Sequence, residues 1–289
     1  MREFVITTES NSDLPLEYIE ENQIGVIPHY YTVEEEQYGG DRELSVSEFY
    51  AAMRAEKKVG TMASNPAVIE EMFLAYAEAG RDVLHVSFSS ALSGGCGNVQ
   101  MVARQVMEDH PEMTIVVVDT LSASLGEALL IMKAGEMKKE GRTLQETAEA
   151  LEALVPNLCV QFTVDDLNHL CRGGRLSKTS AVLGTMINIK PILYIDPEGR
   201  LVALSKVRGR KKSIQTLVDN MEQRLGAFRD KQIVIGIVHG DCEEDAALLR
   251  QMVEERLGYH DFLIRPIGPS IGAHSGPGAL GLMFFGEYR

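Results

Sequence analysis

The chain has little of what metal centres, dithiol chemistry and nucleic-acid surfaces require. Its four cysteines are far apart and form no Cys-x-x-Cys pair, which argues against a zinc or redox site. They are typical of reduced, packed thiols in a cytoplasm. Cations are also scarce, because 28 Lys and Arg face 42 Asp and Glu, a formal net charge of −14. This balance argues against nucleic acid as a partner, since affinity for a phosphate backbone comes mainly from cationic contacts.

Long apolar runs are absent as well. Residues 1–9 become polar before an export signal could form, and no later run is long enough to span a bilayer. We therefore expect no integral membrane segment and a cytoplasmic location. A length of 289 residues is large for one compact core, so we expect two domains.

The first half alternates short apolar runs with segments of helical spacing. This order predicts an α/β domain with a doubly wound, mostly parallel sheet. The expected strands are 4–7, 25–31, 82–87 and 113–119, and the expected helices are 47–56, 66–79, 99–109 and 125–139. Loops at the carboxyl ends of such strands meet at one edge of the sheet. Here they are 9–13, 87–97 and 119–126, all rich in hydroxyl groups and small residues.

The order of elements changes after Pro156 and Asn157, which interrupt a helical pattern. We place a domain boundary there, giving domains 1–157 and 158–289. The second domain is expected to be α+β, with a short helix at 167–171 and a hairpin of strands 191–195 and 201–207. Helices at 211–225 and 243–257 and strands at 232–239 and 261–266 complete it.

A glycine-rich segment, SGGCGN at 93–98, lies between an expected strand and an expected helix. Its amides and the helix N-terminus can bind an anion, with the Ser93 hydroxyl adding a directed hydrogen bond. The segment lacks the Lys-Ser/Thr ending of a P-loop and the third glycine of a dinucleotide fingerprint. Ala91 also stands where a nucleophile elbow has glycine. The alternative is a flexible connection in which Ser93 caps the helix.

His274 introduces the run HSGPG at 274–278, a glycine-proline turn that restricts the backbone. An imidazole in such a turn is a candidate for facing a ligand, and the alternative is a surface residue in a plain turn. Asp241 and Glu244 have the spacing of a capping box, which we prefer to a metal site. We expect no metal.

The segment 206–212 places five Lys and Arg in an otherwise acidic chain, three of them where a helix is expected to begin. Cations at a helix N-terminus oppose the macrodipole, so another role is plausible for them. One interpretation is a docking patch for an acidic partner or a nucleotide phosphate. The other is an ordinary solvated face.

Taken together, several segments resemble the DegV family, whose characterised bacterial members are the fatty-acid-binding subunits of fatty acid kinase. The resemblance spans nearly the whole chain and depends on the order and spacing of its motifs. These are TESNSDLP at 8–15, LSG at 92–94, VDT at 118–120, LCRGGRLS at 170–177, IKPIL at 189–193 and IGAHSGPGALG at 271–281. Two departures stand out, Glu9 where the family has Asp and Gly95-Cys96 where it often has Thr-Tyr.

The resemblance implies that one long-chain fatty acid is buried between the two domains as the only ligand, with no cofactor. Its carboxylate would contact Thr61, Ser93, Gly94 and His274, although the family's threonine motif can also be aligned on residues 63–66. The expected walls of the acyl-chain pocket are apolar residues near the motifs. They are Leu92, Ile187, Ile189, Ile192 and Ile271.

The resemblance also implies that the chain itself is not an enzyme. In the family, a separate ATP-using kinase subunit phosphorylates the bound carboxylate to an acyl phosphate for phospholipid metabolism. Arg208 and Arg210 are the expected docking residues, whereas Arg172 and Arg175 are interpreted as structural. The competing hypothesis is a serine acyl hydrolase with Ser93 as nucleophile, His274 as base and Asp119 as orienter.

Overall fold

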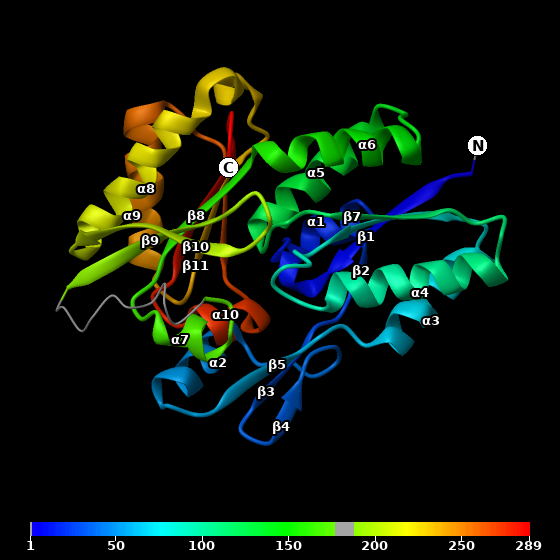
Figure 1. Cartoon of the computed structure of the whole chain (residues 1–289), viewed down its shortest axis with the longest axis horizontal. Coiled ribbons are helices and arrows are strands. Elements are labelled where there is room, and N and C mark those ends of the chain that lie inside the picture. The colour runs from blue at the N-terminus through cyan, green and yellow to red at the C-terminus, as the bar shows by residue number, and fades with distance from the viewer. Residues whose placement is uncertain (1, 177–187) are drawn as a thin grey trace.

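The computed structural model describes residues 2–176 and 188–289 of the protein. It contains two large β-sheets and one small one (Figure 1). The first sheet has the order β2-β1-β6-β7, and all of its pairs are parallel. Its strands are β1 Phe4–Glu9, β2 Gly25–Ile27, β6 Asp82–Ser87 and β7 Ile115–Asp119. The expected α/β class is confirmed, and so is the doubly wound parallel sheet.

Helices cover both faces of this sheet, which is why its strands are apolar on both sides. In β1, Val5 packs with α3 and α4, whereas Phe4 and Ile6 pack with α5 and α6. The covering helices are α3 Pro66–Glu78, α4 Gly95–Asp109, α5 Leu125–Lys139 and α6 Leu144–Leu154. The shorter helices of this half are η1 Ser10–Ser12, α1 Leu16–Glu21 and η2 Val155–Asn157.

The single strand expected at 25–31 is wrong. The structure has two strands there, β2 in the parallel sheet and β3 Tyr30–Val33 in a three-stranded antiparallel sheet. Pro28 lies between them and has no backbone N–H for a ladder, while the N–H of His29 donates to Ser10 Oγ at 2.9 Å. The small sheet also contains β4 Glu36–Tyr38 and β5 Val59–Met62, and α2 Val46–Arg54 packs on it.

The third sheet has the order β10-β9-β8-β13-β11-β12 and is antiparallel except between β11 and β12. Its strands are β8 Leu158–Thr163, β9 Ile189–Ile195, β10 Leu201–Arg208, β11 Ile235–His239, β12 Phe262–Pro266 and β13 Leu280–Phe285. All six follow residue 157, where the sequence analysis divides the chain. The central strands β8 and β13 were not predicted, because their residues are almost all buried and show no polar alternation.

One face of this mixed sheet is covered by α8 Arg210–Leu225 and α9 Glu243–Leu257, and the other faces α5 of the first half. The remaining helices are α7 Asn168–Arg172, η3 Gly226–Lys231 and α10 Pro269–Ser275. The capping box predicted at Asp241 and Glu244 is wrong. The N-cap of α9 is Cys242, without a side-chain cap bond, and Asp241 instead pairs with Arg54 of α2. Within residues 2–176 and 188–289, no helix has the length and apolarity needed to cross a membrane.

Candidate ligand-binding pocket between the two large sheets

A pocket of about 220 Å³ lies between the parallel sheet and the mixed sheet. On one side it is lined by the loops that follow β1, β6 and β7, as expected for the carboxyl edge of a doubly wound sheet. On the other side it is lined by strands of the mixed sheet and by α10. The lining includes Phe88, Leu92, Val160, Phe162, Ile195, Leu201, Val238, Ile271 and Met283, so much of the wall is apolar.

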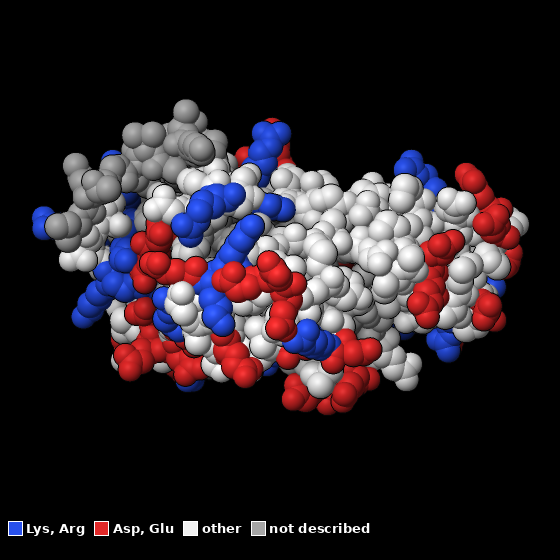
Figure 2. All heavy atoms as spheres, turned by 90° about the horizontal axis from the view of Figure 1, so that it is seen from below, with Lys and Arg blue, Asp and Glu red and all other residues white. Residues whose placement is uncertain are grey.

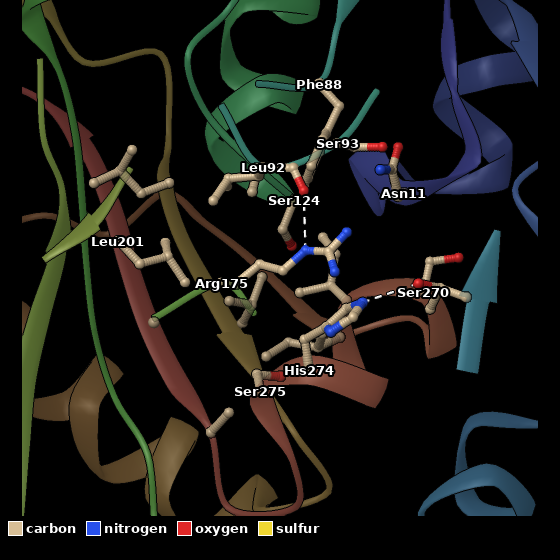
Figure 3. A pocket seen from close by; sticks show the side chains of 18 of the residues that line it. Asn11, Phe88, Leu92, Ser93, Ser124, Arg175, Leu201, Ser270, His274 and Ser275 are labelled. Carbon is tan, nitrogen blue, oxygen red and sulfur yellow. Dashed lines mark hydrogen bonds between the residues drawn. The ribbon is translucent and has the colours of Figure 1, made fainter. Parts of the chain in front are cut away.

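Polar side chains gather at one end of this pocket, which we call the polar end (Figure 3). Thr61 lies on β5 and His274 on α10, and Thr61 Oγ1 is 2.9 Å from His274 Nε2. Ser93 and Gly94 join them from the turn that leads into α4. Residues more than two hundred positions apart in the chain thus meet at one place.

His274 does not lie in the turn where the sequence analysis placed it, because it belongs to the last turn of α10. The glycine-proline turn begins after it, with positive φ at Gly276 and Gly278. The segment 172–174 can approach α10 closely because residue 173 is a glycine, which has no side chain. A Cβ on Gly173 would lie 2.1 Å from His274 Nδ1, so a larger residue there would displace the imidazole.

Burial, and to a smaller extent the nearby charge of Arg175, lower the pKa of His274 from 6.5 to about 4. The imidazole is therefore neutral at physiological pH, with one protonated nitrogen. Its Nδ1 has no hydrogen-bond partner among the residues that the structure describes. Such a ring can orient a polar ligand by hydrogen bonding but supplies no positive charge.

The positive charge at the polar end comes from Arg175, which the sequence analysis interpreted as structural. Its Nε donates to the carbonyl oxygen of Leu92 at 3.0 Å, and Nη1 donates to that of Gly173. No carboxylate pairs with it in the described part of the chain. Burial lowers the pKa of Arg175, which is the direction expected for a cation that lacks an anionic neighbour. An anionic ligand would supply that neighbour.

Ser93 makes one local hydrogen bond, in which its Oγ accepts from the amide of Gly95 at 3.2 Å. The N-cap position of α4 is Gly94, which has no side chain to satisfy the first amides of the helix. The hydroxyl proton of Ser93 and the next two amides of α4, those of Cys96 and Gly97, therefore remain available to an anion. A Cβ on Gly94 would meet no atom within 4 Å, so the pocket wall is open at this point.

Five polar lining residues were not named as candidates in the sequence analysis, and they are Asn11, His29, Ser124, Ser270 and Ser275. Asn11 lies in the loop 9–13, which was expected at this edge, so its position could have been found. His29 could not, because it lies within the segment 25–31, which was wrongly assigned as a single strand. Its Nε2 is 3.0 Å from Ser64 Oγ, and burial lowers its pKa, an effect that the charge of Glu9 partly opposes.

Among the expected wall residues, Leu92 and Ile271 line the pocket. Ile192 does not, because successive residues of β9 face opposite sides of the sheet, and Ile192 is fully buried under α8 and α9. Ile189 is not among the lining residues either. The choice of Ile192 was therefore wrong, since nearness to a motif does not fix the face of a strand. Ile187 lies outside the described residues.

The arrangement needed for a serine hydrolase is not assembled. The base would have to bond Ser93 and be oriented by Asp119. Instead, His274 Nε2 bonds Thr61, and Asp119 Oδ1 accepts the amides of Ser90 and Leu121 in its own loop. The hydrolase hypothesis has no support in this geometry.

The two expected docking residues differ from one another. Arg210 Nε donates to Asp245 Oδ2 at 2.8 Å, and the guanidinium also lies near Asp165, so it is held within the protein. Arg208, at the end of β10, has no ion-pair partner among the described residues and is exposed. On the face shown in Figure 2, Lys and Arg are most frequent toward the end that carries the mixed sheet, mixed with acidic side chains.

Comparison with known proteins adds to this geometry. Residues 3–287 match the model of a family described as uncharacterised proteins of the DegV family. A DegV domain-containing protein of Clostridium perfringens is 37% identical, and the alignment covers 100% of this chain and 99% of the relative. Another from Lactococcus lactis is 36% identical, with 96% of each chain covered.

Solved structures of DegV proteins have the same fold. A DegV family protein of Thermus thermophilus, described as binding fatty acid, is 29% identical with a TM-score of 0.88, covering 99% of this chain and 100% of that one. DegV of Bacillus subtilis, described as a fatty acid binding protein, is 25% identical with a TM-score of 0.86 and the same coverage.

Proposed function

This chain belongs to the DegV family, and from that premise we propose that it binds one long-chain fatty acid in the pocket between the two large sheets. The carboxyl group would lie at the polar end, beside Thr61, Ser93 and His274. Two of the similar solved structures are described as fatty-acid-binding proteins, which supports the ligand class. The observation that carries the proposal is the Thr61–His274 pair at one end of a mostly apolar pocket.

The two parts of the pocket would contribute differently to binding. Burial of about 0.8 kcal/mol per methylene gives roughly 10 kcal/mol for a long saturated chain, before the costs of association. The polar end would mainly fix the orientation of the ligand. There the carboxylate accepts hydrogen bonds from the Ser93 and Thr61 hydroxyls and from the first amides of α4, with Arg175 as the nearby cation.

We further propose that this chain performs no bond chemistry and presents the carboxylate to a separate ATP-dependent kinase. A carboxylate oxygen would attack the γ-phosphorus of ATP, the bond to the bridging oxygen would break, and ADP would leave with that electron pair. The product is an acyl phosphate. ATP and reduced thiols are both cytoplasmic, so the proposal places the chain there.

Arg208 is the proposed docking residue for the kinase, because it is exposed and its charge is not used within the described structure. Arg210 is a weaker candidate, since Asp245 and Asp165 already neutralise it. An Arg208→Ala variant is expected to retain fatty-acid affinity and to lose acyl-phosphate formation. Equal loss of both would show that Arg208 belongs to the fold rather than to an interface.

The first experiment is lipid extraction from the purified protein under denaturing conditions, followed by mass spectrometry, with native mass spectrometry for stoichiometry. We expect one fatty acid per chain. A protein that is purified empty and then refuses added fatty acids would contradict the proposal. The profile of extracted acids would also show which chain lengths the pocket accepts.

A further inference from the structure

Asp13 is a partly buried residue whose carboxyl group joins segments from both halves of the chain. It follows η1 and has a left-handed backbone conformation, with φ 56°. Its Oδ1 accepts the amide N–H of Gly268 at 3.0 Å, and its Oδ2 accepts the hydroxyl of Ser124. Gly268 is the N-cap of α10, and Ser124 is the N-cap of α5. One carboxylate therefore connects the first residues of two helices.

Both partners of Asp13 belong to the wall of the pocket or lead into it. Ser124 lines the pocket and has a strained conformation, with φ 54° and ψ −136°. The segment after Gly268 supplies several further lining residues, which are Ser270, Ile271, His274 and Ser275. The hydrogen bonds of Asp13 thus bridge the two sides of the pocket.

The start of α10 is held by a second contact from the first half of the chain. Tyr50 Oη donates to the carbonyl oxygen of Ile267 at 3.1 Å, which belongs to the same peptide group whose N–H donates to Asp13. The fit around Gly268 is close, because a Cβ there would lie 2.8 Å from Asp13 Oδ1. The far end of α10 carries His274, which bonds Thr61 of β5. Helix α10 is therefore attached to the first half of the chain at both ends.

From this geometry we infer that Asp13 is a positioning residue for the polar end of the pocket, holding α10 where His274 can meet Thr61 and a bound carboxyl group. The inference rests on the proposed fatty-acid binding. Asp13 itself is not among the residues that line the pocket. It acts through Gly268 and Ser124, so removing it changes the position of lining residues without changing their identity.

The environment of Asp13 agrees with a role that depends on geometry rather than on a charge pair. Burial raises its pKa from 3.8 to about 6, although the Ser124 and Gly268 hydrogen bonds and the charge of Arg265 lower it. A carboxyl group that is costly to ionise is retained only where its hydrogen bonds compensate for burial. The hydrogen bonds from Gly268 and Ser124 provide that compensation.

The test compares Asp13→Ala, Asp13→Ser and Asp13→Asn with the wild type, using displacement of a fluorescent long-chain fatty acid by hexadecanoic acid. Alanine removes both hydrogen bonds, and serine is too short to reach both partners. Asparagine can accept from Gly268 through its oxygen and donate to Ser124 through its nitrogen. We expect Asp13→Ala and Asp13→Ser to weaken binding about tenfold, and Asp13→Asn to remain within about threefold of wild type.

Asn157→Ala is the matched control for a loss of stability alone. Asn157 Nδ2 donates to the carbonyl oxygens of Gly286 and Glu287, and none of these residues lines the pocket. The control should lower Tm and leave fatty-acid affinity unchanged. If Asp13→Ser binds as tightly as wild type, or if Asp13→Asn is as weak as Asp13→Ser, the inference is overturned. A wild-type protein that binds no fatty acid would instead overturn the proposed function.

A second readout follows His274 directly and needs no ligand. Its pKa is about 4 because α10 holds it in a buried position. In the Asp13→Ser variant we expect nuclear magnetic resonance to show this pKa rising toward 6.5, with the signal assigned by comparison with His274→Gln. Asp13→Asn should keep the low value. An unchanged His274 pKa in Asp13→Ser would mean that Asp13 does not set the position of α10.

Discussion

The two ends of the pocket are built in different ways. The apolar wall comes largely from paired strands such as β8, β11 and β13, whose backbones are fixed by the sheet. The polar end comes from a short helix, a strand of the small sheet and two loops, joined by single hydrogen bonds such as that between Thr61 and His274. Regular structure thus shapes the part of the pocket that is proposed to hold the acyl chain, and local contacts shape the part that is proposed to hold the carboxyl group.

The largest effect is expected at the polar end. We predict that His274→Ala abolishes acyl-phosphate formation with the cognate kinase and weakens fatty-acid binding about 10- to 100-fold. The reason is the loss of a hydrogen-bonding group beside a charged ligand, which costs about 1.5–3 kcal/mol. Binding is measured by displacement of a fluorescent fatty acid, and phosphorylation by product mass.

His260→Ala is the control, because His260 is exposed and, among the described residues, is paired with Glu254 alone. It should behave as wild type in both assays. Unchanged acyl-phosphate formation in His274→Ala would contradict the role of the imidazole, and with it the contrast between the two ends.

At the apolar wall, Val238→Phe is predicted to change chain preference. Val238 lines the pocket from β11 and is almost fully buried, so the added volume must enter the pocket or strain the sheet. Overpacking of about 1–3 kcal/mol predicts about 5- to 100-fold weaker binding of long chains. Short chains that end before this position should bind as before, as a series of saturated acids in the displacement assay would show.

Ile237→Val is the control on the same strand. Ile237 is fully buried on the opposite face of the sheet, against α8 and α9. Its substitution should cost about 0.5–1.5 kcal/mol of stability and leave chain preference unchanged. If Val238→Phe weakened binding of fatty acids of every chain length by a similar factor, the apolar wall would not determine chain-length preference.

A substitution of Arg175 tests whether the polar end of the pocket acts through charge. Arg175→Gln keeps a polar side chain but removes the only cation that the structure describes among the lining residues. We predict about tenfold weaker binding of a fatty acid and unchanged binding of the fatty alcohol with the same number of carbons, because only the acid carries a charge. Equal loss for acid and alcohol would mean that Arg175 acts through packing against Leu92 and Gly173.

The fold was predictable from the sequence where local pattern decides it. Helix α5 was predicted with its observed bounds, and the loops after β1, β6 and β7 meet at one edge as the order of strands requires. The faces of the mixed sheet were not predictable, because strands buried on both sides show no alternation. That is why Ile192 was assigned to the pocket although it packs under α8.

The site was predictable only in part. Glycine-rich segments drew attention to Ser93 and His274, and the resemblance supplied Thr61. The partner of His274 and the cation at Arg175 depend on contacts between residues about one hundred or more positions apart, which no local pattern encodes. Asp13 belongs to a motif that the resemblance used, yet its two partners appear only once α5 and α10 are placed.

Stability is expected to change with pH in opposite directions for His274 and Asp13. The pKa of His274 falls from 6.5 to about 4 on folding, so below pH 6.5 the unfolded chain takes up a proton that the folded chain does not. Its contribution to the free energy of unfolding therefore decreases as pH falls from 6.5 toward 4, by no more than about 1.4 kcal/mol per pH unit. Asp13 acts in the opposite direction, because its pKa rises from 3.8 to about 6 on folding. The folded chain therefore binds this proton at a higher pH than the unfolded chain, and stability increases as pH falls from about 6 toward 3.8.

In urea titrations at pH 4.5, 5.5, 6.5 and 7.5, His274→Gln should gain stability relative to wild type only at the acidic end. Asp13→Asn should lose relative stability in the same range, so two parallel curves would contradict the opposite signs assigned to these groups.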